Sequence, residues 1–393
     1  MKRIISILTA LALGLCLAIP AAAAPDAQSA NLKFRTDGTF KIIQVTDTQD
    51  FLLSCQVTQD FLYELAKTER PDLFVLTGDN VGTGGAKGLP KFLAKLLVKL
   101  SVENLMRAFD KIYKDFGIPM TMVFGNHDNE VGPDKVSRAE QFAMYAAHKC
   151  FIGYYIDAAD KGTGDEQGQH YGTHNIVIKN SAGTAPAFNL WMFDSGSYDE
   201  RGGYSSVQTA QVDWFTQLNG TLNLPSIAFQ HIIVPEIFAP GVLTPEKTLP
   251  AGTVGVLREN PCPGNYNYGQ YDALSAGGVL ALFVGHDHVN TYELRLPGTD
   301  LINSPCTGFG AYGDIDLRGA RIITLDESDL TGYETRLVTF QTFFGPNTLR
   351  RARLNMYQSM STPATLLDWI SFKPLLWLLD LFKLTPDYAP PAA

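Results

Sequence analysis

Apolar runs that lead into polar residues alternate with segments of helical spacing through the first third of the chain. Each run carries β-branched and aromatic residues, which is typical of buried strands. The intervening segments have helical stops, since one ends before Pro71 and the other before Gly117. The predicted elements are a strand at 40–50, a helix at 58–70, a strand at 73–80, a helix at 91–116 and a strand at 119–128.

The second half continues with apolar runs and one clear helix. Residues 157–175 are rich in Gly and Asp and predict a surface loop. A helix is expected over 205–220, with Ser206 as its N-cap and Gly220 at its end. The further predictions are a hairpin at 175–196 and strands at 226–236, 277–290, 320–326 and 335–341. Together these patterns predict an α/β fold, in which ligand sites lie at the carboxyl ends of strands.

Both ends of the chain differ from this pattern. Residues 1–24 combine Lys2 and Arg3, an apolar stretch and small residues, so they predict a cleaved signal peptide. A retained anchor is the alternative. The signal places the mature protein in the periplasm or outside the cell. Of the 393 residues, 38–345 fit one domain, and 346–393 form a C-terminal amphipathic helical extension.

Within that extension, residues 365–384 are too charged, and too interrupted by Pro374, for a membrane span. They are expected either to touch a membrane surface peripherally or to pack on the domain or a partner. The net charge of −9 comes with no basic stripe, so no nucleic-acid-binding surface is expected.

Four of the five cysteines follow the signal peptide. Export permits disulfides, and four cysteines allow three pairings that the sequence leaves open. Cys262–Cys306 is the pair we expect. The absence of any C-x-x-C spacing argues against a zinc–cysteine site.

Polar residues with metal-binding side chains collect at the ends of five apolar runs. Carboxylate oxygens and imidazole nitrogens are common ligands for Zn, Mn and Fe. A single histidine at a strand end is usually structural, but five such ends together favour a metal site. The residues are Asp47 and Gln49, Asp79, Asn126 and His127, His231, and His286 and His288.

These residues occur in the order D-x-Q, G-D-N, G-N-H-D, H and G-H-D-H. The pattern resembles the calcineurin-like metallophosphoesterases over about residues 40–325. "GDN", "HIIVPE", "GHDH" and "RGARIITL" are most similar to the branch related to purple acid phosphatases. The resemblance implies a four-layer α-β-β-α sandwich, in which two mixed β-sheets are flanked by helices.

The resemblance also implies two divalent metal ions, Mn, Zn or Fe, with a bridging hydroxide that attacks phosphorus in line. Asp79 would bridge both ions. The first ion would be held by Asp47, Gln49, Asp79 and His288, and the second by Asp79, Asn126, His231 and His286. His127 would contact the substrate and protonate the leaving oxygen, with Asp128 orienting His127 or a ligand.

Two positions depart from the family pattern. Gln49 stands where the family has histidine, and an amide oxygen is a weaker ligand for zinc or iron, so the first site is expected to bind metal more weakly or to prefer Mn. Gly82 stands where purple acid phosphatases carry tyrosine, so no purple colour is expected.

Other polar residues are weaker candidates. Asn265, with Glu259 and Asn267, lies in a Gly/Pro-rich loop where substrate contacts are expected, and Asn265 is the substrate-binding residue we select. His174 could line the cleft. Asp287 is either a support for the ligands or solvated.

The expected function is an exported dinuclear phosphohydrolase acting on phosphomonoesters. A phosphodiesterase acting on nucleotides or lipid head groups is one alternative. A catalytically weak metal-binding protein is the other, and Gln49 is its only support.

Overall fold

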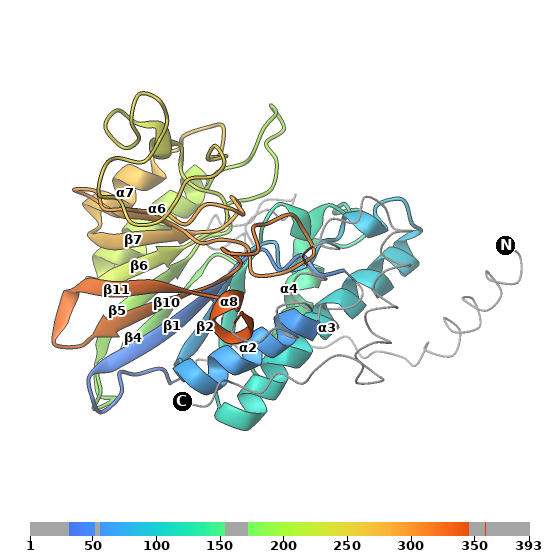
Figure 1. Cartoon of the computed structure of the whole chain (residues 1–393), viewed down its shortest axis with the longest axis horizontal. Helices are drawn as coiled ribbons and strands as arrows, with labels where there is room; N and C mark the ends of the chain where they lie inside the picture. The colour runs from blue at the N-terminus through green and yellow to red at the C-terminus, as the bar shows by residue number, and fades with distance from the viewer. Residues whose placement is uncertain (1–30, 52–55, 154–171, 346–357, 359–393) are drawn as a thin grey trace, which may run out of the picture.

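The computed structural model describes residues 31–51, 56–153, 172–345 and 358 (Figure 1). The predicted signal peptide, 1–24, and the segment 365–384 lie outside the described residues, so their roles stay predictions. All described helices and strands lie between Thr39 and Phe344. No helix among the described residues is both long and apolar enough to cross a membrane.

Two mixed β-sheets form the centre of the molecule. In the first, β1, β2 and β3 run parallel, and β10 pairs antiparallel with both β1 and the edge strand β11. Its order is β11-β10-β1-β2-β3. The strands are β1 (Thr39–Val45), β2 (Leu73–Thr77), β3 (Met120–Val123), β10 (Gly319–Asp326) and β11 (Asp329–Thr339).

The second sheet has the order β4-β5-β6-β7-β9-β8. Its four central strands, β5, β6, β7 and β9, are parallel, and β4 and β8 pair antiparallel at the two edges. The strands are β4 (His174–Lys179), β5 (Pro186–Met192), β6 (Ser226–Phe229), β7 (Val279–Val284), β8 (Glu293–Leu294) and β9 (Asp300–Asn303). The β4–β5 pair is the predicted hairpin.

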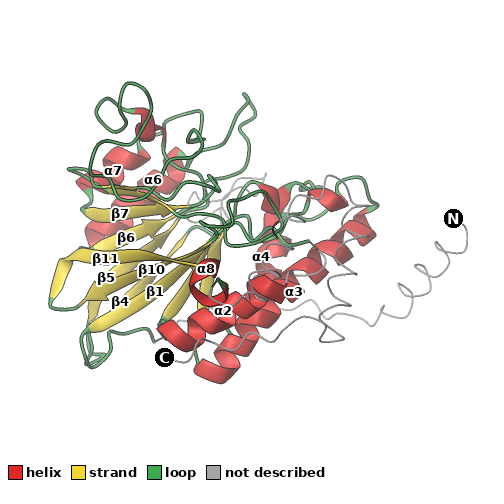
Figure 2. Cartoon of the chain, viewed as in Figure 1, coloured by secondary structure: helices red, strands yellow, loops and turns green. Residues whose placement is uncertain are grey.

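Helices cover the outer face of each sheet, as Figure 2 shows. The first sheet packs against α2, α3, α4 and α8, and the second against α6 and α7. The helices are α2 (Gln56–Glu69), α3 (Lys91–Phe116), α4 (Arg138–Ala146), α6 (Thr209–Leu222), α7 (Gln270–Ala276) and α8 (Phe340–Phe344). The single-turn 3-10 helices are η1 (Gly84–Ala86), η2 (His127–Asn129) and η3 (Pro235–Phe238).

Alternate residues of each central strand enter different cores. On β1, Ile43 and Val45 pack toward the helices, whereas Phe40 and Ile42 pack toward the second sheet. Residues on both faces are buried, which explains why the strand reads as a nearly continuous apolar run. Three apolar layers thus separate four layers of secondary structure, and the predicted α-β-β-α sandwich is confirmed.

Several local predictions need correction. Helix α6 has Gln208 rather than Ser206 at its N-cap, and the Gln211 side chain accepts from the Gln208 backbone N–H at 2.8 Å. Gly220 lies inside α6, which ends at a left-handed Asn223. The strand predicted over 226–236 ends at Phe229, before the turn that carries His231.

The expected Cys262–Cys306 disulfide is wrong. Both cysteines are free thiols, and so is Cys150. Cys306 is buried, with its sulfur 3.1 Å from an Arg318 guanidinium nitrogen that donates to it. Cys262 lies on an exposed loop.

Candidate metal centre

The polar ends of strands from both sheets meet at one edge of the sandwich. Asp47 follows β1, Asp79 follows β2 and Asn126 follows β3, all from the first sheet. His231 follows β6 and His286 follows β7, both from the second sheet. Because parallel strands of one sheet end at the same edge, residues far apart in sequence become neighbours.

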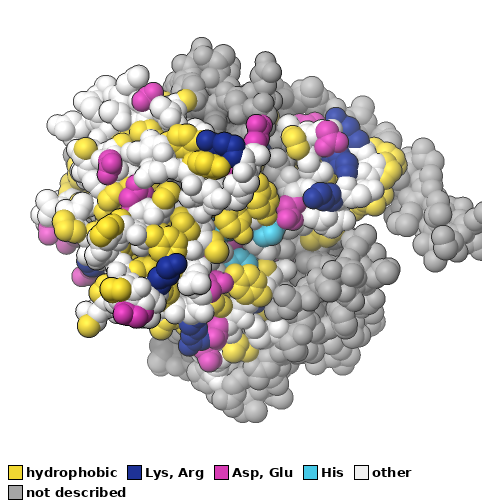
Figure 3. Space-filling view, turned by 90° about the horizontal axis from the view of Figure 1, so that it is seen from above, with side chains coloured by type: hydrophobic (Ala, Val, Ile, Leu, Met, Phe, Trp, Pro, Cys, Tyr) yellow, Lys and Arg dark blue, Asp and Glu magenta, His cyan; other side chains and the backbone are white. Residues whose placement is uncertain are grey.

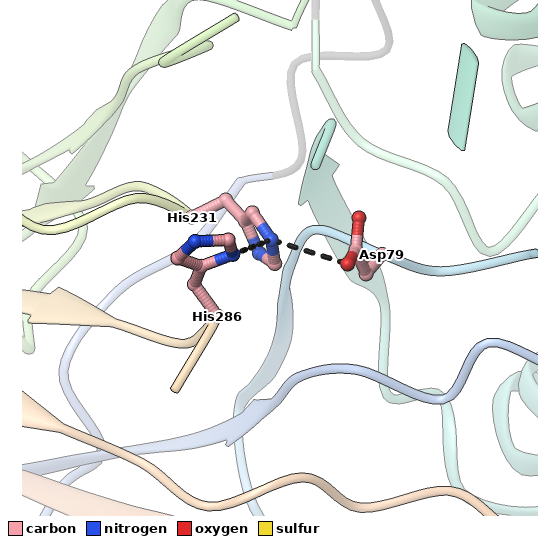
Figure 4. A group of neighbouring side chains, drawn as sticks. All are labelled: Asp79, His231 and His286. Carbon is pink, nitrogen blue, oxygen red and sulfur yellow. Dashed lines mark hydrogen bonds and ion pairs between the residues drawn. The ribbon is translucent and has the colours of Figure 1, made fainter. Parts of the chain in front are cut away.

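Asp79, His231 and His286 form one buried cluster (Figure 4). The His231 Nε2 atom lies 3.3 Å from the Asp79 Oδ2 atom and 3.3 Å from the His286 Nδ1 atom. The Asn126 Oδ1 atom lies 3.1 Å from the same His231 nitrogen. The four residues expected to hold the second ion are therefore in mutual contact.

Asp47, Asp79 and His288 form an adjoining buried cluster. The His288 Nε2 atom lies 3.2 Å from the Asp47 Oδ1 atom. Gln49 joins them, since its amide nitrogen donates to Asp79 Oδ2 at 2.7 Å. The structure thus brings the four residues expected at the first site together, and Asp79 belongs to both clusters.

The backbone at these residues is strained. Asp47, Gln49, Asp79 and His286 have φ values of 53°, 45°, 49° and 70°. Few non-glycine residues adopt positive φ, and such strain persists where the surrounding structure holds it in place. Four of the seven described non-glycine residues with positive φ are candidate ligands, which marks this edge as the functional site.

The glycine of the G-N-H-D motif gives the loop its close approach to Asp79. A Cβ atom on Gly125 would lie 2.2 Å from the Asp79 Oδ1 atom. A side chain there would displace either the carboxylate or the loop that carries Asn126. The packing of two ligand loops therefore requires this glycine.

Hydrogen bonds orient the imidazole rings. The Nδ1 atom of His231 lies 2.9 Å from the Thr77 carbonyl oxygen, and that of His288 lies 2.8 Å from the Tyr312 carbonyl oxygen. A ring that donates through Nδ1 presents Nε2 as a lone pair, which is the usual orientation of a metal-bound histidine.

The donors fit divalent metal ions. His286 Nε2 is buried and has no hydrogen-bond partner among the described residues, and buried Asp47 Oδ1 has only the ion-pair contact with the His288 imidazole. Buried polar atoms without partners are costly, and a cation would satisfy both. The carboxylate, imidazole and amide donors match the preferences of Mn, Zn or Fe.

Mutual electrostatics keep the carboxylates ionised. Burial would raise the pKa of Asp79, but the imidazoles of His231 and His127 outweigh it and hold that pKa well below its usual value. Burial opposes protonation of His231, yet Asp79 and Asp47 raise its pKa to about 10. Burial and the neighbouring His231 lower the pKa of His286 to about 3, so His286 is a neutral ligand.

His127 lies at the open side of the cluster. Its backbone N–H donates to Asp79 Oδ1 at 2.7 Å, and its side chain is 37% exposed. The carboxylate beside its ring is Glu130, whose Oε1 atom lies 3.0 Å from His127 Nδ1. Glu130 was not predicted from the sequence, because it lies outside the motif and only the turn of η2 brings it to the ring.

Asp128 was expected to orient either His127 or a ligand, and its contacts are with the ligand-bearing loops. It is buried and accepts hydrogen bonds from the backbone N–H groups of Gly125, at 2.8 Å, and Val81, at 3.0 Å. It therefore ties the loop after β3 to the loop after β2. Asp128 positions the loop that bears Asn126 rather than the imidazole of His127.

Asn265 contacts a neighbouring loop, and its expected role in substrate binding stays a prediction. Its side-chain amide donates to the Gly202 carbonyl at 3.1 Å. Glu259 is likewise engaged, accepting from the Tyr312 hydroxyl at 2.7 Å. Asp287 is buried rather than solvated and accepts from the Cys262 N–H at 3.1 Å.

Two histidines outside the motifs, His174 and His148, do not reach the clusters. His174 is fully buried, and its Nε2 atom lies 2.9 Å from the Thr121 hydroxyl. Burial lowers the pKa of His174 to about 4, so it is a neutral core residue and not a lining of the cleft. His148 pairs with Asp110 at 2.8 Å, and His170 lies outside the described residues.

A family model described as calcineurin-like phosphoesterase matches residues 40–290, and the chain belongs to this family. It is 28% identical over 351 residues to "Probable inactive purple acid phosphatase 14" of Arabidopsis thaliana, covering 79% of this chain and 80% of that protein. It is 29% identical over 360 residues to "Probable inactive purple acid phosphatase 29" of the same plant, covering 79% and 82%.

A solved structure also aligns with the chain. A dimetal phosphatase from Danio rerio aligns with 77% of this chain and 99% of its own, at 12% identity and a TM-score of 0.44. The family membership rests on the matched family model, and the fold on the two sheets and three cores.

Proposed function

We propose that this chain is an exported phosphohydrolase that uses two divalent metal ions to cleave phosphate monoesters. The observation that carries the proposal is that two buried ligand clusters share Asp79, with the partly exposed His127 beside them. The family's phosphoester chemistry supports the same reaction class. The export part of the proposal rests on residues 1–24 alone.

The candidate ligands divide between two ions. When bound, the ions would act as Lewis acids at the phosphoryl oxygens and favour a deprotonated water as nucleophile. The neutral amide of Gln49 favours a hard ion such as Mn in the first site, whereas Zn and Fe suit the second. Asp47, Gln49, Asp79 and His288 would hold the first ion, and Asp79, Asn126, His231 and His286 the second.

His127 is suited to donate a proton to the leaving oxygen. Burial disfavours its charged form, but the carboxylates of Asp79 and Glu130 raise its pKa to about 9. A general acid must carry a proton, and the carboxylate of Glu130 beside the ring favours the protonated imidazole. Glu130 holds the ring through Nδ1 and leaves Nε2 for the substrate.

Two other functions remain as alternatives. The relatives named "probable inactive" and the Gln49 substitution favour a metal-binding protein of weak activity. Against this, the other expected ligands are present and meet. A phosphodiesterase would use the same centre, and the esters in the experiment below distinguish the two reactions.

The test measures phosphate release by the protein lacking residues 1–24. Nitrophenyl phosphate and bis-nitrophenyl phosphate are supplied with Mn or with Zn, and metal content is measured in parallel. We expect metal-dependent turnover, faster on the monoester, that falls at least about 100-fold in His127→Ala. His148→Ala, a histidine far from the clusters, is the matched control. Full metal loading without turnover would support the weak-activity alternative.

Export and membrane contact need separate tests. N-terminal sequencing of protein recovered outside the cytoplasm should begin near Pro25 if the signal peptide is cleaved. Liposome sedimentation of the chain with and without residues 362–393 tests the peripheral contact. Equal sedimentation of the two forms would remove the membrane contact from the proposal.

A further inference from the structure

A loop between β5 and α6 carries two stacked tyrosines beside the metal centre. Tyr198 and Tyr204 form an isolated antiparallel bridge across the loop. Their ring centroids lie 5.6 Å apart with the planes at 26°. This is an offset stack, an arrangement that aromatic pairs prefer.

Both tyrosines touch candidate metal ligands. The Tyr204 ring meets the His286 ring edge to face, with centroids 4.4 Å apart and planes at 83°. The Tyr198 hydroxyl accepts a hydrogen bond from the Asn126 side-chain amide at 3.2 Å. The two tyrosines therefore line the site, in direct contact with candidate ligands.

Tyr198 is nevertheless 52% exposed. The stack with Tyr204 engages one face of its ring, so the exposed part of Tyr198 lies elsewhere on the residue. Tyr312, 46% exposed, stacks on His288 at 4.2 Å on another side of the centre. In Figure 3 the histidine side chains visible at the surface are bordered mainly by yellow hydrophobic ones.

The loop is held in place rather than loosely attached. The Arg138 guanidinium bonds both carboxylate oxygens of Asp194, at 2.7 and 2.6 Å, and also the Ser197 hydroxyl. At the tip of the loop, the Asn265 side chain donates to the Gly202 carbonyl, and Gly203 packs closely against the same side chain. A rigid aromatic surface binds a flat group at a low entropic cost.

We propose that Tyr198, backed by Tyr204, is a stacking platform for a flat aromatic leaving group on the phosphate ester. The inference rests on the proposed function and adds a substrate class to it. Tyr198 contacts Asn126, which directly precedes His127 in the loop after β3. A leaving group protonated by His127 therefore lies within reach of the partly exposed Tyr198.

The test compares esters that differ only in an aromatic group. Adenosine 5′-phosphate is paired with ribose 5-phosphate, and benzyl phosphate with cyclohexylmethyl phosphate. Within each pair the leaving oxygen is a primary alcohol, so differences in kcat/KM report contacts with the ring. We expect each aromatic ester to be preferred by about tenfold, the size of one stacking contact. A preference confined to the adenosine ester would identify a nucleobase site, whereas a preference in both pairs identifies a general arene site.

Three variants separate stacking from other effects. Tyr198→Ala and Tyr198→Leu should reduce the preference to below about twofold. Tyr198→Phe should retain it, because it keeps the ring and loses only the bond with Asn126. If Tyr198→Phe loses the preference as fully as Tyr198→Ala, or if Tyr198→Leu keeps it, the platform is refuted.

A binding measurement separates this inference from the proposed function. Benzylphosphonate and cyclohexylmethylphosphonate, which cannot be hydrolysed, are titrated calorimetrically into the metal-loaded protein and its Tyr198 variants. Tighter binding of the arene that depends on the Tyr198 ring supports the platform, even if no ester is turned over. Equal binding of the two phosphonates overturns it, whatever the hydrolysis assay shows.

Discussion

Removing the Arg138 guanidinium should destabilise the fold strongly, because the group is buried and paired. Arg138 is 2% exposed and bonds both oxygens of the fully buried Asp194, as well as the Gly125 carbonyl at 3.3 Å. Arg138→Met retains most of the apolar stem and deletes the charge. Loss of one member of a buried ion pair costs about 3–5 kcal/mol, since the other charge is left unpaired.

The loss should depend on pH. Burial raises the pKa of Asp194 from 3.8 to about 6, although Arg138 acts to lower it. Because the folded value is raised, the stabilising contribution of the neutral carboxyl is present below pH 3.8 and is lost as the pH rises toward 6. Without Arg138 the pKa of Asp194 rises further, so the variant should lose additional stability relative to the parent above pH 6.

Urea unfolding at pH 5 and pH 8 measures both effects. We expect the difference in unfolding free energy between parent and Arg138→Met to be larger at pH 8. The Arg138→Met/Asp194→Asn double variant should recover part of the loss at pH 8, since it leaves no buried charge. A difference below about 1 kcal/mol at pH 8, or equal differences at the two pH values, would refute the reasoning.

Three further predictions concern the metal centre. Adding Mn or Zn to metal-stripped protein should raise the unfolding free energy by about 2.7 kcal/mol at a free metal concentration 100 times Kd, and Asp79→Asn should abolish most of that gain in thermal melts. Gln49→His should tighten Zn binding at the first site by about tenfold in a metal titration, because imidazole is the better ligand for this ion. An unchanged Kd would show that Gln49 is not a ligand. Gly125→Ala should remove metal binding, since its Cβ atom would lie 2.2 Å from Asp79 Oδ1. The control is Gly220→Ala, whose Cβ atom would have no neighbouring atom within 4 Å. This control should keep metal binding and gain up to about 1 kcal/mol of stability in urea unfolding.

The predicted elements that hold in the structure are those with strong local signals. Helix α3 (Lys91–Phe116) follows Pro90 and ends at Gly117, whose φ of 73° is the left-handed cap expected of glycine. Strands β1, β2 and β3 can be predicted from the sequence because both of their faces are buried, which makes each a nearly continuous apolar run. The short helices α4 and α7 went unpredicted, since seven to nine residues give a weak periodic signal.

The segment N-terminal to β1 also gives too weak a local signal for its burial to be predicted. The residues before 38 are mostly polar, yet Leu32 and Phe34 are buried and Lys33 bridges to Lys179 of β4. Two apolar residues form too short a pattern to indicate burial. Their burial depends on a strand that lies more than 140 residues away along the chain.

By itself the sequence indicated an α/β fold and the set of residues that can bind metal, because strand periodicity and the residue following each strand are local properties. The four-layer arrangement was implied by the resemblance to a known family. Tertiary structure alone decided which atoms meet. It placed Glu130 rather than Asp128 beside His127, sent His174 into the core, left Cys262 and Cys306 unpaired, and stacked Tyr198 on Tyr204 at the site. The physical reason is that a contact between distant segments depends on register, loop path and side-chain direction, none of which leaves a periodic trace along the chain.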